Sequence, residues 1–117
     1  MDEQNKVIIY TASDGQTKID VKLEDETLWL MQAQMCELYQ TSRTNVVEHI
    51  KHIYEEGELD KEATCRNFRQ VREEGGRKVE REMTFYNLDM IIALGYRVRS
   101  IIATRFRQWA TLRLKEY

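Results

Sequence analysis

The sequence predicts a single α+β domain of 117 residues with elements in the order β-β-α-α-β-β-α-α. Three observations predict this order. There are β-hairpin patterns at 6–23 and 66–86, two amphipathic helical stretches lie between them, and two further helical stretches follow the second hairpin. A helix pair followed by a hairpin is the layout of a winged helix-turn-helix, in which the first helix and the wing brace the second helix.

The first hairpin is predicted from two short runs rich in β-branched residues, 6–10 and 19–23. In the second run Ile19, Val21 and Leu23 share one face, as in a half-buried strand. Asp14-Gly15 between the runs is a strong turn signal, so the two runs are expected to pair with each other.

The first helical stretch is predicted to begin at a cap residue, Asp25 or Thr27, and to end near Tyr39-Gln40. Its apolar side chains recur at helical spacing: Leu28, Met31, Met35 and Leu38. A polar break at Thr41-Ser42 separates it from the next helix, and this short break predicts a tight helix-turn-helix connection.

The second helical stretch is predicted to be capped by Ser42, to run through Tyr54 and to end with Gly57 in the C′ position. One apolar stripe points to the core: Val46, Val47, Ile50, Ile53 and Tyr54. The stripe turns four polar residues outward: Thr44, Asn45, Glu48 and His52.

The remaining elements follow from local turn and cap signals. Gly75-Gly76 joins two strand-like runs into the second hairpin. Asn87 is expected to cap a short helix over 88–94 that Gly95 stops, and Ser100 is expected to cap a last helix over 101–115. The predicted buried stripe of this last helix is Ile102, Phe106, Trp109 and Leu112.

The charge of the chain is unevenly distributed, although its net value is only −2. Residues 1–30 and 31–65 each hold three basic and seven acidic side chains, a net charge of −4, whereas 66–117 hold twelve basic and six acidic side chains, a net charge of +6. This excludes a polybasic, histone-like protein but permits nucleic-acid binding through one face. Intramolecular pairing between the acidic and basic halves is the alternative.

The candidate DNA-binding residues lie at the start of the second helix and at the tip of the second hairpin. Arginine and asparagine have the geometry for bidentate contacts to base edges, and a helix N-terminus suits phosphate oxygens. The candidates are Thr41, Ser42, Arg43, Thr44, Asn45, His52, Arg77 and Lys78. An ordinary surface helix and a solvated strand face show similar patterns, and both alternatives stay open.

The last helix offers a further interpretation. Its arginines flank Phe106 and Trp109, so a basic and aromatic platform for nucleic acid is conceivable. At helical spacing such aromatic residues more often belong to the core.

Catalytic and metal-binding motifs are absent from the sequence. His49 and His52 are three residues apart but have no third ligand at a convincing spacing, and no phosphate-binding glycine motif occurs. Cys36 and Cys65 are expected to be buried, reduced thiols. We therefore expect no enzymatic activity, no metal, no cofactor and no small-molecule substrate.

The expected location is the cytoplasm. The acidic N-terminus lacks the pattern of a secretory signal, and no apolar run approaches the roughly 20 residues of a membrane span. No association with a membrane is expected.

Two segments carry a family resemblance, Phe85–Ser100 (FYNLDMIIALGYRVRS) and Phe106–Thr111 (FRQWAT). Together with Tyr39–Val47 and Ile50 they resemble the RhuM virulence-protein family, bacterial proteins often found on pathogenicity islands and mobile elements. The resemblance extends roughly from Ile8 to Tyr117. Members generally continue past this point, which implies that residues 1–117 form the N-terminal domain of a longer protein.

The FRQWAT segment is also similar to the closing helix of phage BRO-N-type domains, which are DNA-binding modules. This similarity is shorter than the first, and it agrees with the double-stranded DNA partner expected from the helix-turn-helix and hairpin layout. The family itself has no well-defined molecular activity, so no catalytic residue is carried over from it.

The competing functional hypothesis is a protein-interaction domain or a homodimer without affinity for DNA. Its basis is the acidic outer face formed by Glu48, Glu55 and Glu56, which could dock on the arginines of the last helix.

Overall fold

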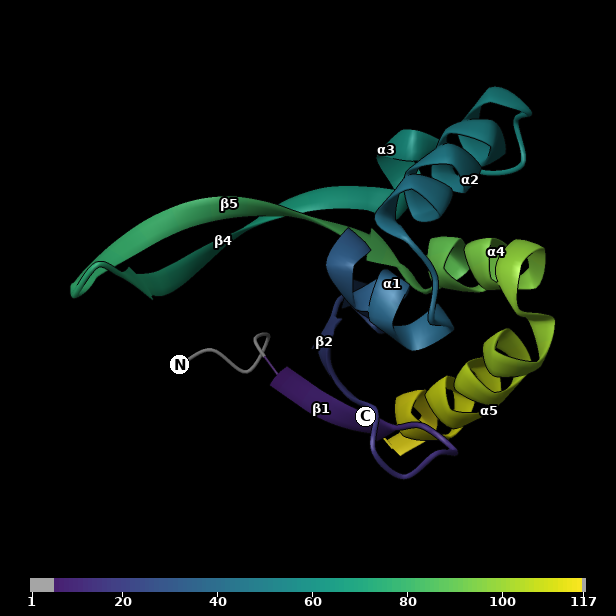
Figure 1. Cartoon of the computed structure of the whole chain (residues 1–117), viewed down its shortest axis with the longest axis horizontal. Coiled ribbons are helices and arrows are strands. Elements are labelled where there is room, and N and C mark those ends of the chain that lie inside the picture. Colours follow the sequence, from purple (N-terminus) through teal and green to yellow (C-terminus); the bar gives the residue numbers. More distant parts are fainter. Residues whose placement is uncertain (1–5, 117) are drawn as a thin grey trace.

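The computed structural model describes residues 6–116, which form a mixed α+β fold (Figure 1). Five strands make one antiparallel sheet in the order β1-β2-β3-β5-β4. Five helices accompany the sheet in the described range. The elements are β1 (Lys6–Thr11), β2 (Lys18–Glu24), β3 (Thr27–Leu30), α1 (Gln32–Tyr39), α2 (Arg43–Glu55), α3 (Lys61–Thr64), β4 (Cys65–Glu74), β5 (Arg77–Asn87), α4 (Leu88–Val98) and α5 (Ser100–Glu116).

The N-terminal hairpin is confirmed. Tyr10 lies opposite Ile19 in the β1–β2 register. In the turn, a carboxylate oxygen of Asp14 accepts hydrogen bonds of 2.8 Å from the amides of Gln16 and Thr17. These bonds, above all the one from Thr17, hold the pKa of Asp14 below its usual value. The turn is therefore closed by its own side chain, as in an Asx-turn.

The prediction of a helix starting at Asp25 or Thr27 is wrong. Thr27–Leu30 is the strand β3, and α1 begins only at Gln32. Asp25 and Glu26 form a two-residue turn with left-handed backbones, φ 54° and 62°. No glycine marks this turn in the sequence, although glycine or asparagine is the usual residue in such a conformation.

The helix-turn-helix connection is confirmed, with corrections in detail. The Ser42 hydroxyl accepts the amide of Asn45 at 3.1 Å and caps α2. Val46, Ile50 and Ile53 are buried as expected, but Val47 is 40% exposed. The apolar stripe of α2 that faces the core is therefore narrower than predicted, because Val47 lies outside it.

The end of α2 also matches the prediction. Gly57 follows it with φ 77°, the left-handed conformation that suits a C′ glycine. The one-turn helix α3, capped by Asp60, was not predicted.

The core lies between the sheet and the helices α1, α4 and α5. Leu28 and Leu30 of β3 are fully buried together with Met35, Met90 and Leu94 of the helices. On α5 the buried residues are Ala103, Phe106 and Ala110, whereas Leu112 is 63% exposed and its predicted place in the core is wrong. The small side chains of Ala103 and Ala110 let α5 approach the core closely.

Gly95 does not stop α4, which continues to Val98. A Cβ atom at Gly95 would lie only 2.3 Å from the hydroxyl oxygen of Tyr39 and 2.6 Å from the Cβ of Ala103. The glycine is therefore needed for close approach of three elements rather than for a turn. The Tyr39 hydroxyl donates a 2.6 Å hydrogen bond to the carbonyl of Ile91 one turn earlier.

The second hairpin is confirmed, and its length is its main feature (Figure 1). β5 pairs with β3 only at Asn87 and Tyr86, and from there outward it pairs with β4 alone. The turn at Gly75-Gly76 has φ values of 59° and 79°. We call residues 66–85 the arm, a two-stranded ribbon with both outer edges unpaired among the described residues.

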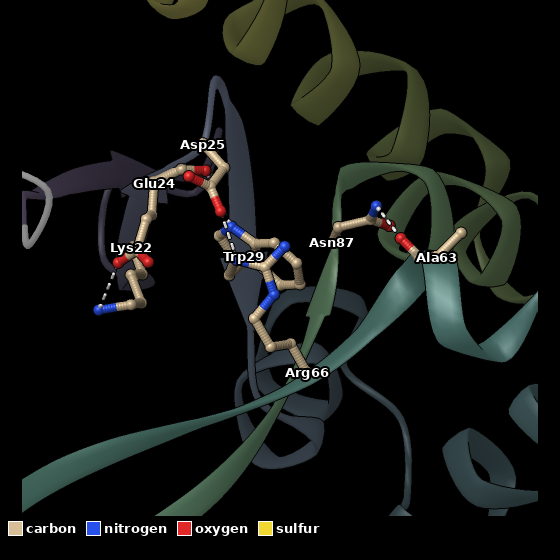
Figure 2. A network of polar contacts seen from close by, with 7 residues as sticks. All are labelled: Lys22, Glu24, Asp25, Trp29, Ala63, Arg66 and Asn87. Atoms are coloured by element: carbon tan, nitrogen blue, oxygen red, sulfur yellow. Dashed lines mark hydrogen bonds and ion pairs between the residues drawn. The ribbon is translucent and has the colours of Figure 1, made fainter.

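A group of aromatic and basic side chains anchors the arm where it leaves the sheet, and Figure 2 shows three of them, Lys22, Trp29 and Arg66. The Phe68 ring lies edge-on to Trp29 at 5.2 Å and to Phe85 at 5.3 Å between centroids. Arg66 lies 4.6 Å above the Trp29 ring and pairs with Asp25, and Lys22 lies 4.6 Å above Phe68. We call Lys22, Trp29, Arg66, Phe68 and Phe85 the root cluster.

The root cluster lies on the side of the sheet opposite the helices. Trp29 alternates with Leu28 and Leu30, which face the helical core, so its indole points to the other face. Its Nε1 donates to the carbonyl of Glu24 at 3.0 Å (Figure 2). The sheet thus has a second, smaller apolar cluster that holds the arm in place.

Candidate nucleic-acid interface

The start of α2 brings the first five candidate residues together. Ser42, Arg43 and Thr44 are exposed, whereas Thr41 and Asn45 are half-buried. The Asn45 side chain donates through Nδ2 to the Thr41 hydroxyl at 2.8 Å. Asn45 would have to give up this bond to contact an adenine edge, so it acts first as a positioning residue for the turn.

Arg43 is the exposed cation of this group. Its side chain forms no ion pair or hydrogen bond with any residue in the described range 6–116. It lies near Cys36 of α1, and burial raises the pKa of that thiol while the charge of Arg43 opposes the rise. The guanidinium is therefore available to an anion.

Arg43 also borders a cavity of about 530 Å³ at the junction of α1, α2 and the base of the arm. Met83 and Thr84 of β5 line the same cavity. The start of α2 and the base of the arm therefore border the same cavity.

His52 lies two turns further along α2 and does not join this group. Its Nε2 is 3.8 Å from a carboxylate oxygen of Glu48, and both side chains are exposed. Glu48 and Glu55 make this part of α2 acidic. Within residues 6–116, no three histidine, cysteine, aspartate or glutamate side chains are grouped so as to hold a metal.

Arg77 and Lys78 occupy the tip of the arm beside the Gly-Gly turn, and both are exposed. Neither side chain forms an ion pair or hydrogen bond with another described residue, although both backbones pair with β4. Six residues of strand separate Arg77 from Met83, a distance of about 20 Å at ~3.4 Å per residue. The tip is therefore well separated from the start of α2.

The middle of the arm is partly neutralised. Arg81 pairs with Glu74 at 2.8 Å, and Arg69 pairs with Glu80 at 3.5 Å. The hydrogen bond from Arg81 lowers the pKa of the Glu74 carboxyl, followed by the effect of its charge. These pairs leave fewer cations for a ligand than the sequence alone suggests.

Arg72, one of the basic residues that the sequence places on the second hairpin, was not among the eight candidate residues. Its guanidinium lies 3.7 Å from the sulfur of Met83, and its charge helps to lower the pKa of the Glu74 carboxyl without forming an ion pair with it. Met83 also lines the cavity next to Arg43, so Arg72 extends the basic surface from α2 toward the tip. No local pattern marks Arg72, because it differs from Arg69 and Arg81 only in lacking a carboxylate partner.

The arginines near and on α5 are largely engaged inside the molecule. Arg97 pairs with Glu56 at 2.7 Å and with Glu58 at 2.8 Å, which ties α4 to the acidic end of α2. The others bind as follows: Arg99 to the Tyr39 carbonyl, Arg105 to Ser13, Arg107 to the Tyr96 hydroxyl and Arg113 to Glu116. Part of the +6 charge of residues 66–117 is thus paired internally.

The aromatic residues of α5 belong to the core. Phe106 is fully buried, and its ring lies 5.0 Å from that of Tyr10. Trp109 also packs against Tyr10 at 5.0 Å. This arrangement favours the core interpretation over a nucleic-acid platform.

Within residues 6–116, no helix is both long and apolar enough to cross a lipid bilayer.

Comparison with known proteins gives one family. Residues 63–117 match the model of the virulence protein RhuM family, a range that includes the end of α3, the arm, α4 and α5. The resemblance of the two C-terminal segments is thereby confirmed, whereas the resembling segment at 39–50 lies outside the matched residues. No curated protein and no solved structure matches the chain.

Proposed function

We propose that this chain, whose residues 63–117 match the model of the virulence protein RhuM family, is the DNA-binding domain of a bacterial, cytoplasmic virulence-associated protein. In this proposal the domain works as a winged helix: α2 enters the major groove, and the arm contacts flanking phosphates. The earlier similarity to BRO-N-type domains is in line with a double-stranded DNA partner.

The observation that carries the proposal is the chain of cations without carboxylate partners. Arg43 lines the same cavity as Met83, Arg72 contacts Met83, and Arg77 and Lys78 lie at the tip of the arm. Nearby arginines of the arm are paired with glutamates. A polyanion would meet positive charge that no ion pair neutralises, with Arg72 and Arg77 on one face of the arm and Lys78 on the other.

The arrangement sets expectations for the mode of binding. Arg43 and Thr44 are the residues of α2 best placed for base edges, and Ser42 and Asn45 hold the helix start in place. The tip lies about 20 Å from the base of the arm, farther than the ~12 Å width of the major groove. Arg77 and Lys78 would therefore contact the backbone outside the groove that α2 enters.

Few phosphate contacts imply modest, salt-sensitive affinity. Each neutralised phosphate adds about −0.9 to the slope of log K against log salt concentration, so four cations give a slope of about −3 to −4. Glu48 and Glu55 limit contact with the groove to the first turns of α2.

A fluorescence-anisotropy titration with random duplex DNA at low salt tests the proposal. Arg43→Ala and Arg77→Glu should each weaken binding several-fold and reduce the salt slope. Arg113→Ala is the matched control, because it removes the same charge from an exposed i,i+3 pair at the far end of α5. No binding at tens of micromolar protein, or equal affinity in all three variants, would refute the proposal.

A second candidate, a protein-interaction domain or homodimer, is favoured by exposed apolar side chains. Ile101 and Leu112 on α5 are 67% and 63% exposed, and Tyr96 on α4 is 47% exposed. The acidic face at Glu56 is less available than the sequence suggests, because Glu56 already binds Arg97. Light scattering separates the candidates: a dimer without affinity for DNA supports this second one.

A further inference from the structure

The cavity of about 530 Å³ between α1, α2 and the base of the arm has the size of a small-molecule site. Its walls are mainly apolar and come from separate parts of the chain. Met31 precedes α1, Cys36 lies on α1, and Met83 lies on β5. Methionine side chains are flexible and polarisable, so such walls adapt to flat or linear apolar groups.

One end of the cavity is positively charged. Arg43 is its single charged lining residue, and it has no carboxylate partner in the described chain. The start of α1 borders the cavity as well, through Gln32 and Ala33. The amides of Gln34 and Met35 already donate to the Met31 carbonyl.

The amides of Gln32 and Ala33 add to this positive end. They lie in the first turn of α1, where backbone N–H groups have no acceptor within the helix. A guanidinium and free amides together favour an anionic group.

We propose that this cavity binds a small amphipathic monoanion, with its apolar body against Met31, Cys36 and Met83 and its carboxylate or sulfonate on Arg43. An uncharged ligand would make no ion pair with the guanidinium. A nucleotide or polyphosphate would bring several negative charges to a site with one cation and apolar walls. A single anionic group on an apolar body matches both halves of the cavity.

Occupancy of the cavity has a consequence for DNA binding, and this consequence alone rests on the proposed function. Arg43 cannot serve a bound monoanion and a phosphate or base at the same time. The ligand would also sit between the start of α2 and the base of the arm. The monoanion is therefore expected to compete with DNA.

A fluorescence titration of the whole chain with 8-anilinonaphthalene-1-sulfonate, an apolar body with one sulfonate, tests the site. N-phenyl-1-naphthylamine is the neutral counterpart. Arg43→Gln should weaken binding of the anionic probe at least about tenfold, equivalent to about 1.4 kcal/mol, and change binding of the neutral probe less than twofold. Arg113→Gln should change neither. Circular dichroism establishes that the variants remain folded.

Two results of this titration would overturn the proposal. One is the absence of saturable binding of the anionic probe. The other is an unchanged dissociation constant in the folded Arg43→Gln variant, because the anion would then bind elsewhere.

A thiol-protection experiment locates the bound probe. Cys36 lines the cavity, whereas Cys65 lies outside it at the start of β4. In the Cys65→Ser variant, saturating probe should slow alkylation of Cys36 by iodoacetamide several-fold. In the Cys36→Ser variant, alkylation of Cys65 should keep its rate. Equal rates at Cys36 with and without the probe would contradict binding in this cavity.

The result of the DNA-binding experiment is independent of the result of the probe titration. If the anionic probe binds at Arg43 but the chain has no affinity for DNA, the ligand site stands and the proposed function is refuted. If DNA binds, adding the probe should lower the anisotropy of the complex in the wild type. DNA binding that is insensitive to a probe shown to occupy the cavity would refute the competition.

Discussion

The body of the molecule and the arm belong to the same sheet but differ in how far their side chains are buried. In the body, β1, β2 and β3 press one face against α1, α4 and α5, and side chains such as Leu28 and Phe106 have no exposed surface. In the arm, Val71 is 63% exposed, and no residue is buried between Met83 and the tip. The body supplies folding stability, whereas the arm displays its surface to the solvent.

The difference shows how an extended ribbon remains ordered. An isolated two-stranded hairpin is at best marginally stable in water. Here the root cluster fixes the arm at one end, where Phe68 packs between Trp29 and Phe85. The arm is therefore expected to loosen progressively from the root to the tip.

The largest difference in stability between the body and the arm is expected from a pair of side-chain truncations. Phe106→Ala removes a fully buried ring from the body and should lower the free energy of unfolding by about 3–5 kcal/mol. Val71→Ala in the arm should change it by less than about 0.5 kcal/mol, since the side chain is mostly exposed. Urea denaturation followed by circular dichroism measures both. Similar losses would show that the arm contributes to the global core.

A smaller effect is expected at the join between the two regions. Trp29→Phe removes the indole N–H that binds the Glu24 carbonyl and reduces contact with Phe68 and Arg66. The expected loss is about 1–3 kcal/mol. Hydrogen exchange should accelerate most at arm amides.

Trp109→Phe on α5 is the matched control for the join, because it shortens the same side chain within the body. It should affect the amides of α5 more than those of the arm. Uniform acceleration in both variants would argue against a separate anchor at the root.

A smaller loss of stability than at Trp29 is expected when a hydroxyl is removed from the body. Tyr39→Phe removes the hydrogen bond to the Ile91 carbonyl and should cost about 1–2 kcal/mol at neutral pH. The pH dependence should change as well. Burial raises the pKa of Tyr39 well above its ordinary value of 10.0.

The direction of this pH dependence follows from the linkage between proton binding and folding. The unfolded chain ionises Tyr39 near pH 10 while the folded chain keeps it neutral, so stability is intact below pH 10 and is lost as pH rises above it. Tyr39→Phe should make the loss of stability between pH 10 and pH 12 shallower in denaturation curves. An unchanged slope would mean that other buried tyrosines dominate alkaline unfolding.

Local chemistry explains which parts of the fold were predictable. Ser42 and Asn87 cap α2 and α4 through their own side chains, and Gly75-Gly76 turns the second hairpin. The strand β3 was missed because its turn uses Asp25 and Glu26, and Asp25 is bound by Arg66, 41 residues away in the sequence. Such a partner is visible only in three dimensions.

The candidate interface was predictable to a similar extent. The tip residues Arg77 and Lys78 follow from the glycine turn, and the start of α2 follows from its cap. Whether an arginine is free depends on where the carboxylates go, as the contrast between Arg72 and Arg81 shows. The cavity beside Arg43 was not predictable, because it combines the starts of two helices with a strand 40 residues later.

The two open edges of the arm have a consequence for the behaviour of the protein at high concentration. Long unpaired edges invite strands of other molecules to add on, the first step toward fibrous aggregates. Charged residues recur along both strands: Arg66, Arg69, Arg72, Glu73 and Glu74 on β4, and Arg77, Lys78, Glu80, Arg81 and Glu82 on β5. Two arms could join only by removing water from these charges, so the length of the ribbon is compatible with a chain that stays dispersed.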